Sequence, residues 1–228
     1  METQINTLWI YGDSFSLTFK QHFETTNDWP QKYKNFKNGI IPKHFSEIIA
    51  EKLGMNINTY AQGGISNINI FDRFVGTFPL IQEDDIVIIN WTALNRFPIA
   101  TNENNFTDII PFVGHPKQND NVSLNTTNEI AVNRDSYSIY YCEVINYCRI
   151  INHILKNNKV IHWTWIDDKK ELITLDRPDF RKIFYDYLVP FKQYETITEE
   201  TKGFFVDQHY SEKGHIDLAN DLLMFLKK

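Results

Sequence analysis

The stretch Leu-Trp-Ile-Tyr-Gly-Asp-Ser-Phe-Ser, residues 8–16, predicts a buried strand that breaks at a glycine and is followed by a serine. The clearest strand of the chain is at residues 86–90, an unbroken apolar run that suits burial on both faces, as in a parallel sheet. Gly12 favours a sharp turn, because glycine adopts backbone conformations that other residues avoid. We therefore expect Ser14 in the loop at the carboxyl end of the first strand.

A second chemical segment lies near the other end of the chain, where Asp207 and His209 are separated by Gln208 alone. A serine hydroxyl is a poor nucleophile until a base takes its proton, and the base works best when a carboxylate orients it. Ser14, His209 and Asp207 supply these three groups. The sequence therefore predicts a serine hydrolase with Ser14 as nucleophile, His209 as base and Asp207 as the orienting carboxylate.

Short apolar runs alternate with helical patterns along the chain, which is typical of a parallel α/β sheet. The pattern predicts strands near residues 7–11, 56–61, 86–90, 160–165 and 203–206, and helices near 43–53, 67–78, 136–157 and from 211 onward. Two stretches, 21–41 and 100–135, fit no element. We expect a single domain over residues 1–228 with insertions at these two places.

The loops that follow the strands of a parallel sheet open at one edge, where ligands collect. By this assignment, Ser14, residues 63–67, residues 91–96 and the Asp207/His209 pair all lie at or near that edge. Four candidate segments at one edge are stronger evidence for a site than any single motif.

Three of these segments together resemble the SGNH/GDSL hydrolase superfamily. The resemblance rests on Gly12-Asp13-Ser14 after the first strand, Gly64 and Asn67 after the second, and Asp207-x-His209 before the last helix. It implies a three-layer α/β/α sandwich with a central five-stranded parallel sheet of the flavodoxin-like type. It also implies the roles already given to Ser14, His209 and Asp207.

The sequence departs from that family in two places. The family usually has two residues between the aspartate and the histidine, whereas here there is one. The usual Gly-x-Asn after the third strand is replaced by residues 90–96, Asn-Trp-Thr-Ala-Leu-Asn-Arg. Asn95 is the best candidate for the asparagine that donates to the oxyanion, with Asn90 or the Thr92 hydroxyl as substitutes.

An oxyanion hole needs preorganised N–H donors, and losing one lowers the rate by about 100- to 1000-fold. The backbone N–H groups of Ser14 and Gly64 are the expected donors beside Asn95. The side chains expected to contact substrate are Asp13, Asn67, Trp91 and Arg96. Each has a structural alternative. Gly-Asp-Ser, which includes Asp13, is a common turn sequence, and Asn67 is equally suited to capping a helix. A buried tryptophan or a salt-bridging arginine is equally common. We expect Ser211 to cap the last helix and the remaining histidines to be structural or exposed.

Three functions compete on these residues. The first is hydrolysis of carboxylic esters with a short acyl group, acetyl above all, including O-acetyl groups of carbohydrates. The second is transfer of the acyl group to a sugar hydroxyl, and the third is a binding module that lost turnover. A metal site built from Asp13, Asp207, His209 and His215 matches no standard zinc spacing. We therefore expect neither a metal nor a cofactor.

Composition bounds the remaining possibilities. A net charge of -6 and a pI near 5.6 in 228 residues disfavour a nucleic-acid partner. The first residues lack the pattern of a signal peptide, and no apolar run approaches the length that spans a bilayer. We expect a cytoplasmic protein with a small-molecule or glycan ester substrate and no membrane partner, and the oligomeric state stays open.

Overall fold

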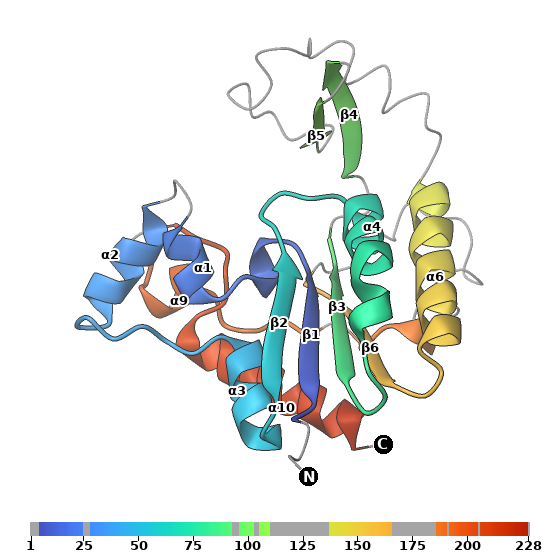
Figure 1. Ribbon diagram of the computed structural model, residues 1–228. Helices are drawn as coiled ribbons and strands as arrows, with labels where there is room; N and C mark the ends of the chain where they lie inside the picture. The colour runs from blue at the N-terminus through green and yellow to red at the C-terminus, as the bar shows by residue number, and fades with distance from the viewer. Residues whose placement is uncertain are drawn as a thin grey trace.

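The computed structural model describes residues 5–24, 28–92, 96–102, 105–109, 137–165, 186–190, 192–204 and 206–227. Four parallel strands form the centre of the molecule in the order β2-β1-β3-β6 (Figure 1). Their bounds are β1 (Thr7–Gly12), β2 (Asn56–Ala61), β3 (Ile86–Trp91) and β6 (Lys159–Thr164). Because β1 lies between β2 and β3, the chain winds outward from β1 in both directions. The carboxyl end of β1 is therefore at the switch point where ligands bind in such sheets.

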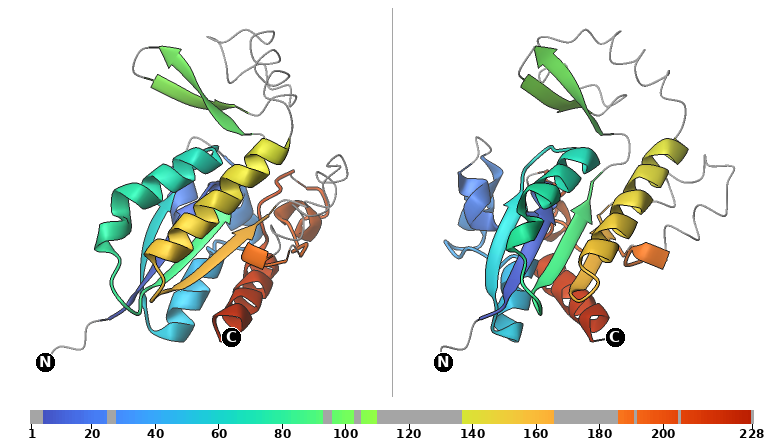
Figure 2. Two further views of the ribbon diagram at one scale, coloured as in Figure 1. Left: turned by 90° about the vertical axis from the view of Figure 1, so that its right-hand side faces the viewer. Right: turned by 45° about the vertical axis from the view of Figure 1, so that its right-hand side comes forward.

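Alternate residues of the central strands point to two separate cores. Trp9, Tyr11, Val87 and Ile89 face α4 (Asn67–Thr77) and α6 (Tyr137–Ile154). Leu8, Ile10, Ile86 and Ile88 face α3 (Phe45–Leu53) and α10 (Glu212–Leu226). The side views in Figure 2 show the two helix pairs on opposite faces of the sheet. The expected α/β/α sandwich is thus present in the described residues.

The sheet has four described strands, and the five-stranded prediction is wrong in its last member. Residues 203 and 204 belong to a turn after α9 (Ile197–Glu200), and Val206 is 79% exposed outside any strand. Among the described residues, the one pairing with β6 from later in the chain is at Leu188, which forms an isolated parallel bridge with His162. The Val189 N–H donates to the His162 carbonyl at 2.8 Å. A single bridge at Leu188 therefore stands where a fifth strand was expected.

Residues 21–41, expected to fit no element, contain the end of α1 (Phe19–Phe23) and all of α2 (Trp29–Phe36). Thr18 and Gln21 form a capping box that begins α1. Pro30 lies in the first turn of α2, where its missing N–H removes nothing from the helix. In the second expected insertion, β4 (Phe97–Asn102) and β5 (Asn105–Ile109) form an antiparallel hairpin beyond the carboxyl end of β3 (Figure 1).

Caps fix where the main helices begin. His44 accepts from the Ser46 N–H, and Glu47 reaches back to the His44 N–H, so that α3 begins at Phe45. The Ser211 hydroxyl accepts from the Gly214 N–H at 3.1 Å, which confirms it as the cap of α10. The described residues also include two short 3-10 turns, η1 (Ser14–Ser16) and η2 (Phe78–Leu80). None of the helices in the described parts of the chain is long and apolar enough to cross a bilayer.

Gly214 marks a point where α10 packs directly on another segment's backbone. A Cβ built there would lie 2.2 Å from the Glu195 carbonyl oxygen, whereas one built at Gly76, within α4, meets nothing within 4 Å. We expect Gly214→Ala to lower the free energy of unfolding by about 1–3 kcal/mol through this overlap. Gly76→Ala should raise it by about 0.5–1 kcal/mol, because alanine restricts the unfolded chain. Urea denaturation of both variants measures this contrast, and equal effects would contradict the close approach at Gly214.

Candidate active site

The side chains of Asp207 and His209 form a tight pair despite the single residue between them. Asp207 Oδ1 accepts from the His209 backbone N–H at 2.8 Å and lies 2.7 Å from His209 Nδ1. One oxygen of the Asp207 carboxylate therefore contacts both the backbone N–H and the imidazole of the residue two positions later. Aspartate is suited to this turn, because its short side chain reaches the backbone two residues ahead. The one-residue spacer is therefore compatible with an aspartate that orients a histidine.

Helix α9 holds the loop that carries this pair. The Thr198 hydroxyl accepts from the Asp207 N–H at 2.8 Å and donates to the Asp207 carbonyl at 2.7 Å. The Ile197 N–H donates to the His209 carbonyl at 2.8 Å. Both residues of the pair are therefore fixed at their backbones, so the imidazole is aimed by the fold as well as by the carboxylate.

The imidazole of His209 lies between aromatic side chains and beside Ser14. Its ring stacks against Phe15 and Trp29, with centroid distances of 4.8 Å to each. His209 and Ser14 both line a cavity of about 10 Å³, close to the volume of one water molecule. His209 Nε2 is buried and has no hydrogen-bond partner among the described residues. The nitrogen opposite the Asp207 bond is thus available beside the serine.

Ser14 begins η1, directly after β1, and the β2–α4 loop passes close to it. A Cβ built at Gly63 would lie 3.8 Å from Ser14 Cβ, and Gly64 has a φ of 80°, a left-handed conformation that favours glycine. Within the described parts of the chain, neither the Ser14 nor the Gly64 backbone N–H donates to an acceptor. Among the described residues, no acceptor therefore occupies the two N–H groups expected to donate to the oxyanion.

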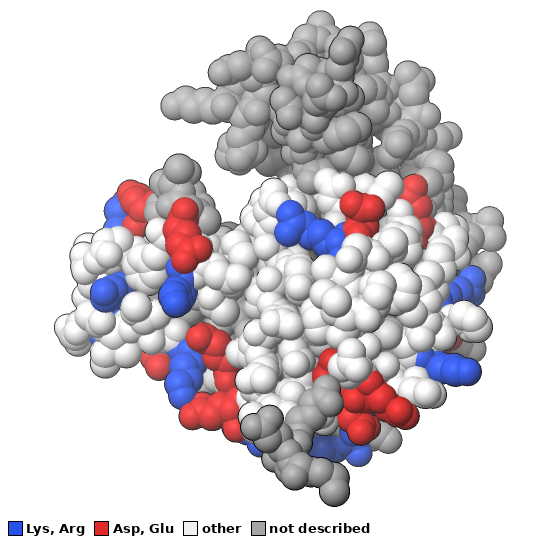
Figure 3. Space-filling view, in the orientation of Figure 1, with Lys and Arg blue, Asp and Glu red and all other residues white. Residues whose placement is uncertain are grey.

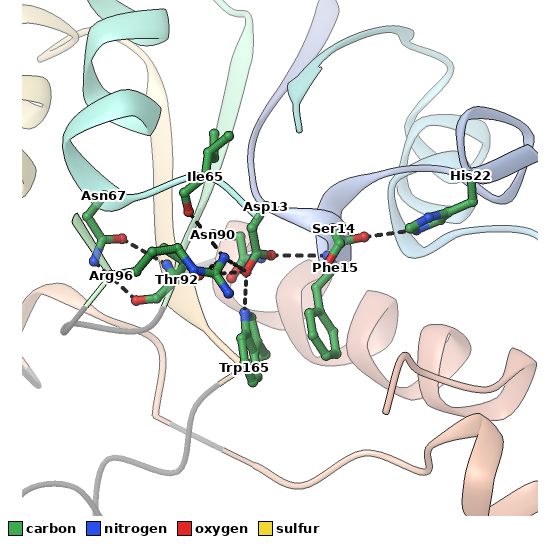
Figure 4. Close-up of polar contacts among 10 residues, drawn as sticks. All are labelled: Asp13, Ser14, Phe15, His22, Ile65, Asn67, Asn90, Thr92, Arg96 and Trp165. Carbon is green, nitrogen blue, oxygen red and sulfur yellow. Dashed lines mark hydrogen bonds and ion pairs between the residues drawn. The ribbon is translucent and has the colours of Figure 1, made fainter. Parts of the chain in front are cut away.

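The Asp13 carboxylate, fully buried, ties together the loops behind Ser14 (Figure 4). Its Oδ1 accepts from the Phe15 N–H at 3.0 Å and from Asn90 Nδ2 at 2.9 Å. Its Oδ2 accepts from the Thr92 hydroxyl at 2.7 Å and from Trp165 Nε1 at 2.8 Å. The ends of β1, β3 and β6 are thus joined through one carboxylate, which positions the turn that carries Ser14.

Asn67 and Arg96 extend this network. The Asn67 side chain donates to the Thr92 carbonyl at 3.1 Å and accepts from the Thr92 N–H at 2.8 Å. Arg96 donates to the Ile65 carbonyl at 3.2 Å and to the Thr92 hydroxyl at 2.9 Å, with its NH1 atom 3.6 Å from Asp13 Oδ2. These contacts join the loops after β2 and β3.

The four side chains expected to contact substrate therefore have structural surroundings. Asp13, Asn67 and Arg96 bond within the network, and Trp91, 1% exposed, packs in the core on Tyr147 and His162. The substitutes named for the oxyanion asparagine, Asn90 and Thr92, donate to Asp13 instead. Asn95, the preferred candidate, lies outside the described residues.

Three histidines expected to be structural or exposed surround the site. His22 lies 4.9 Å from His209 between ring centroids, and its Nε2 contacts the Ser14 carbonyl at 3.0 Å. His44 Nε2 contacts the Phe15 carbonyl at 3.0 Å, and His215 packs on His44 at 4.6 Å. Burial lowers the pKa of His22 to about 4, with His209 contributing, and that of His44 to about 3. The spacing of His44 three residues before Glu47, ahead of an apolar run, is the sequence signal that marks it as a cap.

Buried neutral histidines make stability depend on pH. Burial also lowers the pKa of His162 to about 3, from about 6.5 in the unfolded chain. Below about pH 6.5 the unfolded state binds this proton and the folded state does not, so the free energy of unfolding falls as the pH drops toward 3. His162→Gln, which keeps an N–H for Asn152, should make this fall shallower by up to about 1.4 kcal/mol per pH unit. Urea titrations at pH 7, 6 and 5 measure it, and parallel curves for the two proteins would contradict the prediction.

Charge on the molecular surface is mixed around the sheet. On the face drawn in Figure 3, acidic and basic side chains alternate around a broad uncharged centre. Within the described residues, no group of three histidine, cysteine or acidic side chains is placed to hold a metal ion.

The chain matches no protein-family model and no curated protein. Among solved structures it is similar to a lipolytic G-D-S-L family member from Veillonella parvula DSM 2008, at 13% identity and a TM-score of 0.44, over 97% of this chain and 98% of that one. It is also similar to a carbohydrate esterase described as having divergent catalytic and non-catalytic binding functions, at 13% identity and a TM-score of 0.46, over 100% of this chain and 70% of that one. A further similar structure is an acetyl xylan esterase from the rumen bacterium Butyrivibrio proteoclasticus, at 14% identity and a TM-score of 0.48, over 100% of this chain and 64% of that one.

Proposed function

We propose that this chain is a serine hydrolase that cleaves carboxylic esters through an acyl-Ser14 intermediate. The observation that carries the proposal is the Asp207–His209 pair, bonded at 2.7 Å, with the free Nε2 of His209 buried beside the cavity that Ser14 lines. Carboxylate, imidazole and hydroxyl come from opposite ends of the chain. Nucleophilic catalysis by serine uses these three groups in the order carboxylate, imidazole, hydroxyl.

In the first half of the reaction, Ser14 Oγ attacks the ester carbonyl carbon while His209 Nε2 takes the hydroxyl proton. Asp207 stabilises the imidazolium through the bond at Nδ1. The bond between the carbonyl carbon and the alcohol oxygen then breaks, and His209 gives its proton to the departing alkoxide. An acyl-serine and a free alcohol result.

In the second half, water attacks the acyl-serine, and His209 takes one of its protons. The serine oxygen leaves and receives that proton back from the imidazolium, so the products are a carboxylic acid and free Ser14. Ser14 Oγ and His209 Nε2 are not hydrogen bonded in this structure. Such contacts are often long without substrate and tighten in the complex.

Negative charge that develops on the carbonyl oxygen needs donors already in place. The Ser14 and Gly64 N–H groups, which donate to no acceptor among the described residues, are the donors that we propose. The Asn90 and Thr92 donors are held by Asp13, which leaves Asn95 as the asparagine that we propose for the third position.

The small space beside the nucleophile favours a short acyl group, acetyl above all. Aromatic rings of Phe15, Phe19 and Trp29 line the cavity between Ser14 and His209, and its volume is about 10 Å³. A cavity of this size does not accept extra methylene groups unless the aromatic rings around it move. Acetyl esters, O-acetylated carbohydrates among them, are therefore the substrates to test first.

A fluorophosphonate probe tests the proposal directly, because it forms a stable adduct only with an activated serine. We expect one adduct per chain, located at Ser14 by mass spectrometry, and faster turnover of p-nitrophenyl acetate than of p-nitrophenyl octanoate. Acetate release that is unchanged by added sugars would support hydrolysis over acyl transfer. A folded protein that forms no adduct and releases no acetate would favour the binding module.

A further inference from the structure

Two histidines outside the Asp207–His209 pair form hydrogen bonds with the turn that carries Ser14. His22 Nε2 lies 3.0 Å from the Ser14 carbonyl oxygen, and His44 Nε2 lies 3.0 Å from the Phe15 carbonyl oxygen. A carbonyl oxygen only accepts, so the proton of each imidazole is on Nε2. His22 comes from α1 and His44 from the residue before α3, so two separate elements act on consecutive peptides (Figure 4 draws the His22 contact).

The tautomer of His44 is also fixed from the other side of its ring. The Ser46 N–H donates to His44 Nδ1, at 3.4 Å, and the Ser46 hydroxyl lies 2.8 Å from the same atom. Burial keeps the pKa of both imidazoles well below neutrality, at about 4 for His22 and about 3 for His44. Both rings are therefore neutral Nε2–H donors near pH 7, and neither is poised to act as a base there.

The carbonyls of η1 need such donors, because a single 3-10 turn leaves its last carbonyls without strong partners. The Leu17 N–H donates to the Ser14 carbonyl at 3.3 Å, a long bond. Among the described residues, no backbone N–H donates to the Phe15 carbonyl. The imidazoles thus set the planes of the two peptides that follow the Ser14 and Phe15 α-carbons, and with them the direction of the Ser14 side chain.

We propose that His22 and His44 are positioning residues that hold η1 so that the Ser14 hydroxyl and N–H face the substrate carbonyl. The inference rests on the proposed function of Ser14. It predicts that the N–H donated at the Nε2 position is what matters, rather than an aromatic ring or a titrating base. A misplacement of about 1 Å in such a site lowers the rate by about 100-fold.

Gln and Met substitutions at each histidine distinguish the role of its N–H donor from the role of its volume. Gln places an amide N–H at the same number of bonds from Cα as His Nε2, whereas Met fills similar space without a donor. We expect His22→Met and His44→Met each to lower kcat for p-nitrophenyl acetate by about 10- to 100-fold, with KM changed less than about threefold. His22→Gln and His44→Gln should keep kcat within about threefold of the wild type. His153→Met, at an exposed position on α6, is the matched control and should leave both parameters unchanged.

The rate of fluorophosphonate labelling at Ser14, measured on folded protein, should follow kcat across the series. Should a Met variant fail to fold, the corresponding Asn variant replaces it, since its amide ends one bond short of the carbonyl. Met or Asn variants that match the wild type, or Gln variants that lose as much as Met, would overturn the positioning role. A wild type that neither labels nor hydrolyses would instead overturn the proposed function, and the positioning role would fall with it.

Discussion

Replacing Ser14 with alanine should lower kcat/KM for p-nitrophenyl acetate by about 10⁵- to 10⁶-fold, with the free energy of unfolding nearly unchanged. The substitution removes the atom that we propose becomes covalently bonded to the acyl group. It leaves β1, the Asp13 network and the Ser14 backbone contacts in place. His209→Ala should cause a loss of the same order, because a hydroxyl without its base is no better than no hydroxyl.

Ser16→Ala provides a matched control on the same turn. Ser16 is buried, and its hydroxyl has no hydrogen-bond partner among the described residues, so its removal leaves no donor or acceptor behind. We expect Ser16→Ala to keep activity within a few fold and to keep the probe adduct at Ser14. The double variant of Ser14 and His209 should be no slower than either single variant, since the two groups act as a unit. Substantial residual turnover in Ser14→Ala would exclude the acyl-serine route.

The regular part of the fold follows from local patterns in the sequence. Ile86 and Ile88 face one core while Val87 and Ile89 face the other, so the unbroken apolar run at residues 86–90 correctly predicted a strand buried on both faces. β2 has the bounds that the sequence predicts, and α10 begins directly after its Ser211 cap. These elements are determined by residues close to one another in the chain.

The fifth strand failed because composition cannot reveal a pairing partner. Residues 203–206 are glycine and apolar residues, as in a strand, yet Gly203 adopts a φ of 77° to end α9 and Phe204 is 82% exposed. Among the described residues, Leu188 forms a single bridge with β6 instead. A β-propensity that depends on neighbours from distant parts of the chain cannot be assigned from a short window.

Sequence patterns marked the candidate catalytic residues more readily than the polar contacts around them. The Asp207–His209 pair was visible as two residues in one loop. The Asp13 contacts to Asn90 and Trp165 join positions far apart in the chain, and no local signal marks them. The same holds for His22 and His44, whose partners are carbonyls that every residue carries. Long-range polar contacts of this kind are defined only once the fold exists.

Asp207→Asn tests the negative charge of the carboxylate that bonds His209. Asparagine has the same size and shape as aspartate, and its amide oxygen can take the place of Asp207 Oδ1. That oxygen can still accept from the His209 N–H, so the turn can persist. The negative charge that stabilises the imidazolium is lost, and an amide that presents its NH₂ would hold His209 in the wrong tautomer. We expect kcat to fall by about 10⁴-fold, with KM nearly unchanged.

Two comparisons show whether this loss belongs to catalysis. Asp217→Asn removes a partly exposed carboxylate that pairs with Lys213 on α10, and it should change neither kcat nor KM. Thermal unfolding of Asp207→Asn should remain close to that of the wild type, because the Thr198 contacts to the Asp207 backbone are retained. A variant that keeps wild-type kcat would mean that the fixed backbone of the loop alone orients His209. The carboxylate would then be a structural part of its turn, and the catalytic unit would be a serine–histidine pair.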